Sequence, residues 1–138
     1  DIFKENPRKK LIIAGNYKRN LKKNYPKNIE FVGYKSLNEL NFLYNNAIAF
    51  ILPSLYEGFG LPVLEAIKCN TVVFSSNRGS LKELKNPNIY YFDPESKKDL
   101  NLLLKRKIIF KKNFNEKKYF NKFSWKHNLA KMHKQINS

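Results

Sequence analysis

The 138-residue sequence is poor in acidic residues and in cysteine. It has 11 aspartates and glutamates against 27 lysines and arginines, which gives a formal net charge of +16. Its single cysteine, Cys69, excludes a disulfide within the chain. Only three aspartates occur, Asp1, Asp93 and Asp99, and none belongs to an Asp-x-Asp pair. A divalent metal held by paired aspartates is therefore not expected, and no cofactor is expected either.

Long apolar runs and paired histidines are also missing. No apolar stretch approaches the ~20 residues that a membrane-spanning helix needs. His127 and His133 lie six positions apart in a segment predicted as helical, so they face different sides of that helix. The histidines therefore suggest neither a metal site nor a catalytic base.

The excess of basic residues has three interpretations. It is a compositional excess of lysine spread over the exposed faces, an attraction to an anionic membrane surface, or a nucleic-acid-binding face. Lysine greatly outnumbers arginine here, whereas proteins that read nucleic acids favour arginine for bidentate contacts. With no nucleic-acid-binding motif in the sequence, we expect no nucleic-acid partner, and the other two interpretations stay open.

Short apolar runs alternate with helical segments along the chain. Strands are predicted over residues 10–14, 29–32, 47–52, 71–75 and 88–92. Such alternation predicts an α/β domain, with a Rossmann-like parallel sheet and helices on both faces. The continuous apolar run 47–52 is typical of a central strand that is buried on both faces.

Helices are predicted between and after these strands. Ser36 begins one of them, because Glu39 three residues later completes a capping box. The apolar face of that helix is predicted from Leu37, Leu40, Leu43 and Tyr44. Further helices are expected after Gly60, over about 80–84, from Ser96 towards 108, and over 111–138 with Ser124 as an N-cap.

The segment of residues 53–66 reads Pro-Ser-Leu-Tyr-Glu-Gly-Phe-Gly-Leu-Pro-Val-Leu-Glu-Ala. Gly58 and Gly60 allow backbone angles closed to other residues and a close approach of a ligand. Pro62 suits the first turn of a helix. An apolar strand, a glycine turn and a helix N-terminus together form a phosphate cradle. Glu57 and Glu65 flank this cradle, and carboxylates suit the hydroxyls of a sugar and a ribose, so the pattern predicts a nucleotide-sugar site.

This segment resembles the signature of the retaining glycosyltransferases of family 4, commonly written E-G-F-G-L-P-x-L-E-A. Other parts of the chain are similar to further motifs of the same family, in the same order, at residues 28–34, 37–50, 77–83, 91–95 and 123–125. The resemblance therefore covers nearly the whole chain. It implies the C-terminal, donor-binding half of a GT-B fold.

The resemblance also implies roles for individual residues. Glu57 would be the catalytic residue that orients the transferred sugar, and Glu65 would bind the ribose hydroxyls. The other expected donor contacts are Gly58, Phe59, Gly60 and Leu61 at the phosphates, and Tyr34 and Lys35 at the base. The expected supporting residues are Asn77, Gly79 and Glu83. Since Glu57 and Gly79 both follow carboxyl ends of predicted parallel strands, we expect the sheet to bring them together.

The resemblance also implies that the chain divides into two segments. Residues 1–122 would be the nucleotide-sugar donor domain without its first strand, and residues 123–138 a helix that packs on an acceptor-binding N-terminal domain absent from this sequence. The expected reaction is metal-independent, retaining sugar transfer in bacterial surface polysaccharide or glycolipid synthesis. We expect the protein in the cytoplasm or peripherally at the inner face of the cell membrane. The alternative is a non-catalytic nucleotide-sugar-binding module that needs a partner chain.

Overall fold

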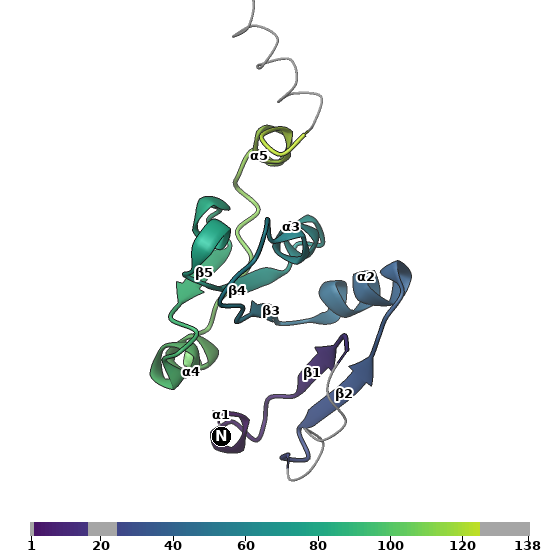
Figure 1. The fold of residues 1–138 in the computed structure, drawn as a ribbon, viewed down its shortest axis with the longest axis vertical. Coiled ribbons are helices and arrows are strands. Elements are labelled where there is room, and N and C mark those ends of the chain that lie inside the picture. The colour runs from purple at the N-terminus through teal and green to yellow at the C-terminus, as the bar shows by residue number, and fades with distance from the viewer. Residues whose placement is uncertain (1, 17–24, 125–138) are drawn as a thin grey trace, which may run out of the picture.

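The computed structural model describes residues 2–16 and 25–124, and it arranges them as an α/β fold (Figure 1). In chain order the elements are α1 (Ile2–Glu5), β1 (Leu11–Ala14), β2 (Ile29–Gly33), α2 (Leu37–Asn46), β3 (Ala49–Leu52), α3 (Leu61–Lys68), β4 (Val72–Ser76), the 3-10 helix η2 (Gly79–Glu83), β5 (Ile89–Phe92), α4 (Lys97–Lys105) and α5 (Glu116–Asn121). Every strand pair among them is parallel. The α/β class predicted from the sequence is confirmed.

The strands form two sheets. One pairs β1 with β2, and the other has the order β3-β4-β5. Within the described residues, β1 and β3 each pair along one edge only, and β1 lies between β2 and β3 in Figure 1. Leu11 of β1 and Ala49 of β3 pack against the same apolar cluster, so both sheets contribute to one layer of the molecule.

Helices cover both faces of this layer. On one face, Val73 and Ile89 join an apolar cluster with residues of α2, α3 and α5. On the other face, Phe74 packs in a cluster with Phe3 of α1 and Leu103 of α4. All five residues of β4 are buried, because β4 has a strand on each side and helices on each face. Within the described ranges, none of the helices has the length and apolar character needed to cross a bilayer.

Two predictions around α2 and β3 are wrong. The run 47–52 was expected to be a central buried strand, but β3 begins at Ala49, is half-buried and lies at the edge of its sheet. Ala47 instead ends α2, with its N–H bonded to the carbonyl of Tyr44. Leu37 was expected on the apolar face of α2 but is 78% exposed, because its position in the first turn faces a pocket. The capping box of Ser36 and Glu39 is confirmed.

The segment after α4 is less helical than the sequence suggested. Residues 107–113 form neither helix nor strand, and only Glu116–Asn121 form a helix within the described part of 111–138. The cause is Asn88, a fully buried residue whose amide bonds both the N–H and the carbonyl of Lys111, at 2.6 and 2.9 Å. The aromatic rings that pack on the domain are Phe110, Phe114, Tyr119, Phe120 and Phe123. The helix expected after Ser124, with Trp125 and both histidines, lies outside the described residues.

Candidate functional site

A single glycine joins the loop after β3 to α3. Gly60 is the N-cap of α3 and has left-handed backbone angles, φ 84° and ψ 40°. A Cβ at this position would lie 2.6 Å from Cδ2 of Leu81 in η2. Both the backbone conformation and the close packing therefore require glycine. Pro62 lies in the first turn of α3, as predicted.

Gly58 does not share this requirement. Its φ is outside the left-handed region, and a Cβ placed on it would meet no atom within 4 Å. The prediction of an unusual backbone angle is therefore confirmed at Gly60 and wrong at Gly58. Gly58 contributes open space beside the loop.

The start of α3 is open. No side chain caps it, and the N–H groups of Phe59, Gly60 and Leu61 donate no hydrogen bond within residues 2–16 and 25–124. Phe59 and Leu61 are exposed, and the Phe59 ring is supported by an edge-to-face contact with Phe123 at 5.5 Å. Free amides and the helix dipole together make such an end attractive to an anion.

Glu57 lies on the loop that leads to this helix start. Its carboxylate oxygen Oε1 accepts a hydrogen bond from Ser54 Oγ at 2.7 Å, and its backbone carbonyl accepts one from Ser80 Oγ at 2.7 Å. Ser80 directly follows Gly79, so Glu57 and the Gly79 turn lie together, as the strand ends predicted. The two serines were not singled out from the sequence. The available signal was their position, because Ser54 lies three residues before Glu57 and Ser80 directly follows Gly79.

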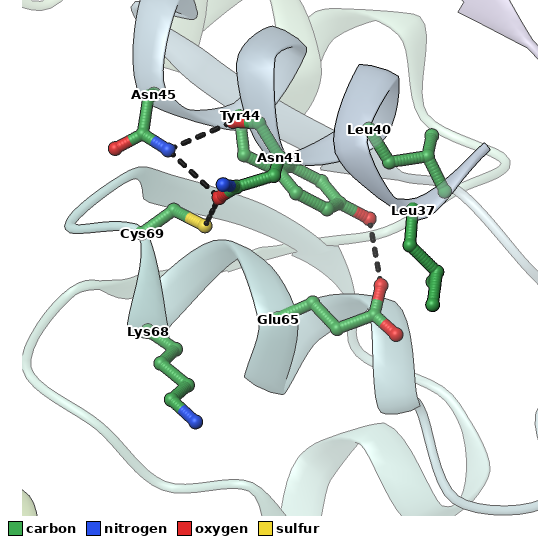
Figure 2. A pocket seen from close by; sticks show the side chains of 8 residues that line it. All are labelled: Leu37, Leu40, Asn41, Tyr44, Asn45, Glu65, Lys68 and Cys69. Carbon is green, nitrogen blue, oxygen red and sulfur yellow. Dashed lines mark hydrogen bonds between the residues drawn. The ribbon is translucent and has the colours of Figure 1, made fainter. Parts of the chain in front are cut away.

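Glu65 lies on the first turns of α3 and faces α2 across a pocket of about 350 Å³ (Figure 2). Tyr44 Oη donates a hydrogen bond to Glu65 Oε2 at 3.2 Å, while Glu65 Oε1 accepts none within the described chain. Burial, followed by the nearby Glu65 carboxylate, raises the pKa of the Tyr44 phenol. Tyr44 therefore remains a protonated donor, and Glu65 keeps an oxygen available. The pocket is lined by Leu37, Leu40, Asn41, Tyr44, Asn45, Glu65, Lys68 and Cys69.

Tyr44 is the functional candidate that the sequence analysis missed. It was assigned to the apolar face of α2, and its ring does pack there, edge-to-face with Phe50 at 5.3 Å. The available signal was its residue type, since a buried tyrosine hydroxyl usually finds a hydrogen-bond partner. Cys69, one turn beyond Glu65, donates a hydrogen bond to Asn41 Oδ1 at 3.1 Å. Burial raises the pKa of its thiol, which favours a packing role.

Tyr34 and Lys35 lie just before Ser36, the N-cap of α2. Tyr34 is 81% exposed, and Lys35 Nζ pairs with Glu39 Oε1 at 2.8 Å. This hydrogen bond from Lys35, with those from Ser36, lowers the pKa of Glu39 from 4.5 to about 2. Lys35 is therefore paired with the first turn of α2. Leu37 in the same turn lines the pocket beside Glu65.

The expected supporting residues lie around η2. Gly79 begins η2 with a left-handed φ of 51°. The side-chain oxygen of Asn77 is buried and has no partner within the described chain, while Glu83, at the end of η2, is exposed. Arg78, which lies between Asn77 and Gly79, donates a hydrogen bond from its guanidinium to Asp93 Oδ1 at 2.9 Å. No three His, Cys, Asp or Glu side chains gather as metal ligands in the part of the chain that the structure describes.

Comparisons with known proteins identify the family of this chain. Residues 1–122 match the family described as glycosyl transferases group 1. Two relatives come from Escherichia coli: O-antigen chain mannosyltransferase B, 48% identical over 41% of this chain and 15% of its own length, and serotype-specific mannosyltransferase WbdA, 34% identical over 69% of this chain and 12% of its own length. A third is O-antigen chain mannosyltransferase RfbU of Salmonella typhimurium, 37% identical over 51% of this chain and 20% of its own length.

The family match covers most of the chain and includes both glutamates, the glycine turn and the start of α3. The chain spans only 12–20% of the length of these three relatives. Their complete activities therefore involve much more polypeptide than is present here. On the strength of the family match, this chain belongs to the group 1 glycosyltransferases.

Proposed function

We propose that this chain is the donor-binding part of a retaining glycosyltransferase, which moves a sugar from a nucleotide-diphosphate donor to an acceptor. The relatives' names support surface polysaccharide synthesis and make a mannosyl donor the first candidate. The proposal includes no metal, because the sequence offers no Asp-x-Asp pair for a metal-held diphosphate.

The observation that carries this proposal is the open start of α3 between two carboxylates. The free N–H groups of Phe59, Gly60 and Leu61 would bind the diphosphate and stabilise the charge that develops on it as the sugar leaves. Glu57, oriented by Ser54, would hold the hydroxyls of the transferred sugar.

Glu65 would bind the other end of the donor. Its free carboxylate oxygen would accept hydrogen bonds from ribose hydroxyls, with Tyr44 holding the second oxygen in place. The pocket between α2 and α3 extends from Glu65 to Leu37, which lies two residues after Lys35 in the sequence. This direction supports a base site at Tyr34 and Lys35.

The proposal also accounts for the two separate sheets. A doubly wound sheet has the strand order 3-2-1-4-5-6 and binds ligands where that order reverses. The two-stranded sheet β2-β1 corresponds to strands 3-2 of this order, and the three-stranded sheet β3-β4-β5 corresponds to strands 4-5-6. We therefore propose that residues 1–122 are completed by a parallel strand between β1 and β3, supplied from outside this chain together with an acceptor-binding domain on which residues 123–138 pack.

Two substitutions in the full-length enzyme test the assigned roles. Glu65→Ala is expected to weaken binding of the nucleoside diphosphate by about 1.5–3 kcal/mol, because a charged hydrogen-bond partner is lost. Glu57→Gln is expected to leave that affinity nearly unchanged and to lower the turnover number, since its contact with the sugar matters most in the transition state. Calorimetry with UDP and GDP and a transfer assay are the measurements.

Glu116→Gln, an exposed change on α5, is the matched control and should alter neither quantity. A loss of affinity in Glu57→Gln with normal turnover would reverse the two roles. Nucleotide binding by the wild type without any transfer would favour the alternative of a non-catalytic nucleotide-sugar module.

A further inference from the structure

The eight residues 105–112, Lys-Arg-Lys-Ile-Ile-Phe-Lys-Lys, form the basic segment, which begins at the last residue of α4 and runs towards α5. Five of the eight are basic and none is acidic. All five basic side chains are exposed, and none pairs with a carboxylate within residues 2–16 and 25–124. The charge of this segment is therefore available to a partner.

The apolar residues at the centre of the basic segment alternate between core and solvent. Ile108 and Phe110 pack against the apolar cluster formed by β4, β5 and α4. Ile109 between them is 70% exposed, so burial alternates along these three residues. A single large apolar side chain thus projects outward between Lys107 and Lys111.

The basic segment has a defined position on the domain. The buried amide of Asn88 bonds the backbone of Lys111 on both sides, at 2.6 and 2.9 Å. A shallow groove of about 600 Å³ separates the segment from Tyr90 of β5. Exposed charge and the exposed Ile109 are therefore presented together on a fixed part of the surface.

We propose that the basic segment is a docking surface for an anionic lipid bilayer. Exposed lysines and arginines are attracted to anionic headgroups, and an apolar side chain among them enters the boundary between headgroups and acyl chains. A single-stranded nucleic acid is the less suitable partner, because it requires exposed aromatic rings for base stacking. The two rings beside the segment, Phe110 and Tyr90, are half-buried and packed against the apolar cluster, so neither stands exposed as stacking requires.

Docking at this surface leaves the candidate donor site open. Asn88, which holds the basic segment, directly precedes β5 and so lies at the amino end of the parallel strands. Glu57 follows the carboxyl end of β3, at the opposite end of the sheet. The inference does not depend on the proposed sugar transfer, because its test measures binding to vesicles alone.

The test compares two triple variants of the full-length protein that remove the same charge from different places. One changes the basic segment: Arg106→Gln, Lys107→Gln and Lys112→Gln. The matched control changes exposed lysines of α4 and α5: Lys98→Gln, Lys117→Gln and Lys118→Gln. Binding is measured by sedimentation with vesicles of equimolar phosphatidylglycerol and phosphatidylcholine, and with vesicles of phosphatidylcholine alone.

The wild type should bind the anionic vesicles and not the neutral ones. The segment triple should lose affinity by roughly a hundred-fold, since each basic residue near the surface contributes about five-fold. The control triple should lose at most a few-fold, and Ile109→Ser alone about five-fold. Equal losses in the two triples, no binding to anionic vesicles, or tighter binding to a single-stranded oligonucleotide through the same residues would overturn the proposal.

Discussion

The helices of this domain begin in two different ways. At the start of α2, Ser36 Oγ accepts the N–H of Glu39, and Glu39 Oε2 accepts the N–H of Ser36. Ser96 and Asn115 cap α4 and α5 in the same manner, each accepting an N–H three residues later. At α3, Gly60 offers no side chain and the first amides stay free. The difference separates α2, α4 and α5, whose starts are closed by a side chain, from α3, whose open start lies between Glu57 and Glu65 in the sequence.

The open start of α3 is stable for a reason unrelated to capping. A side-chain cap typically stabilises a helix by about 1 kcal/mol, and α3 lacks such a cap. Four of its residues, Val63, Leu64, Ala66 and Ile67, are buried in the core. Because tertiary packing supplies most helix stability in proteins, this buried face holds α3 in place while its first turn remains available to a ligand.

The largest expected effect comes from closing the space at Gly60. Gly60→Ala should destabilise the protein by about 3 kcal/mol, from a left-handed alanine and an overpacked contact with Leu81. The free energy of unfolding from urea denaturation measures this loss. Gly58→Ala, two residues away in open space, should change it by less than about 1 kcal/mol. Equal losses in the two variants would show that the backbone of Gly60 is not specially constrained.

The next effect removes a cap from the closed helix. Ser36→Ala should cost about 1 kcal/mol of unfolding free energy, because it removes the hydroxyl that accepts the N–H of Glu39 and donates to Glu39 Oε2. Ser36→Thr keeps the hydroxyl and should retain most of that stability in the same denaturation experiment. If alanine were tolerated as well as threonine, the cap of α2 would not contribute to the contrast with α3.

A smaller effect is expected where the two helices meet. Tyr44→Phe removes the hydroxyl that bonds Glu65 at 3.2 Å and should lower nucleoside diphosphate affinity by about 0.5 kcal/mol, or roughly two-fold. Tyr119→Phe is the control, because its hydroxyl bonds the carbonyl of Leu84, which does not line the Glu65 pocket. Calorimetry on the full-length variants distinguishes them. A greater loss of affinity in Tyr119→Phe would remove Tyr44 from the site.

The smallest effect concerns the charge at the start of α2. The pKa of Glu39 is lowered to about 2 by the hydrogen bond from Lys35 and then by those from Ser36. A carboxyl group with a depressed pKa stabilises the fold above its unfolded pKa, and this contribution is lost as the pH falls from about 4.5 towards about 2. Glu39→Gln keeps the capping geometry without the charge.

The urea midpoint of the wild type should therefore exceed that of Glu39→Gln at neutral pH, and the two should converge near pH 2. Salt should reduce the difference, because the pair is exposed. A difference that stays constant over this pH range would show that the charge of Glu39 does not stabilise the start of α2.

Local patterns were sufficient to predict much of this structure. The capping box at Ser36 and the helix start at Gly60 follow from residues close in sequence. The α/β class follows from alternation along the whole chain. The meeting of Glu57 with the Gly79 turn was also predictable, since both follow carboxyl ends of parallel strands.

Features set by distant partners could not be predicted. An apolar run such as 47–52 has the same composition in a central strand and in an edge strand, so the edge position of β3 depends on which strands are available to pair. The non-helical course after α4 is held by Asn88, 23 residues from Lys111. The bond from Tyr44 to Glu65 spans 21 residues and is invisible to any pattern within one helix.

Among residues 2–16 and 25–124, β1 and β3 each have one edge that pairs with no strand, and this has a consequence for the colloidal behaviour of the chain. A strand edge without a partner strand can pair with other molecules, while a net charge of +16 keeps molecules apart by mutual repulsion. Salt weakens the repulsion without covering the edges. Low ionic strength should therefore keep the 138-residue chain monomeric, and concentrated salt should drive it into oligomers joined strand to strand.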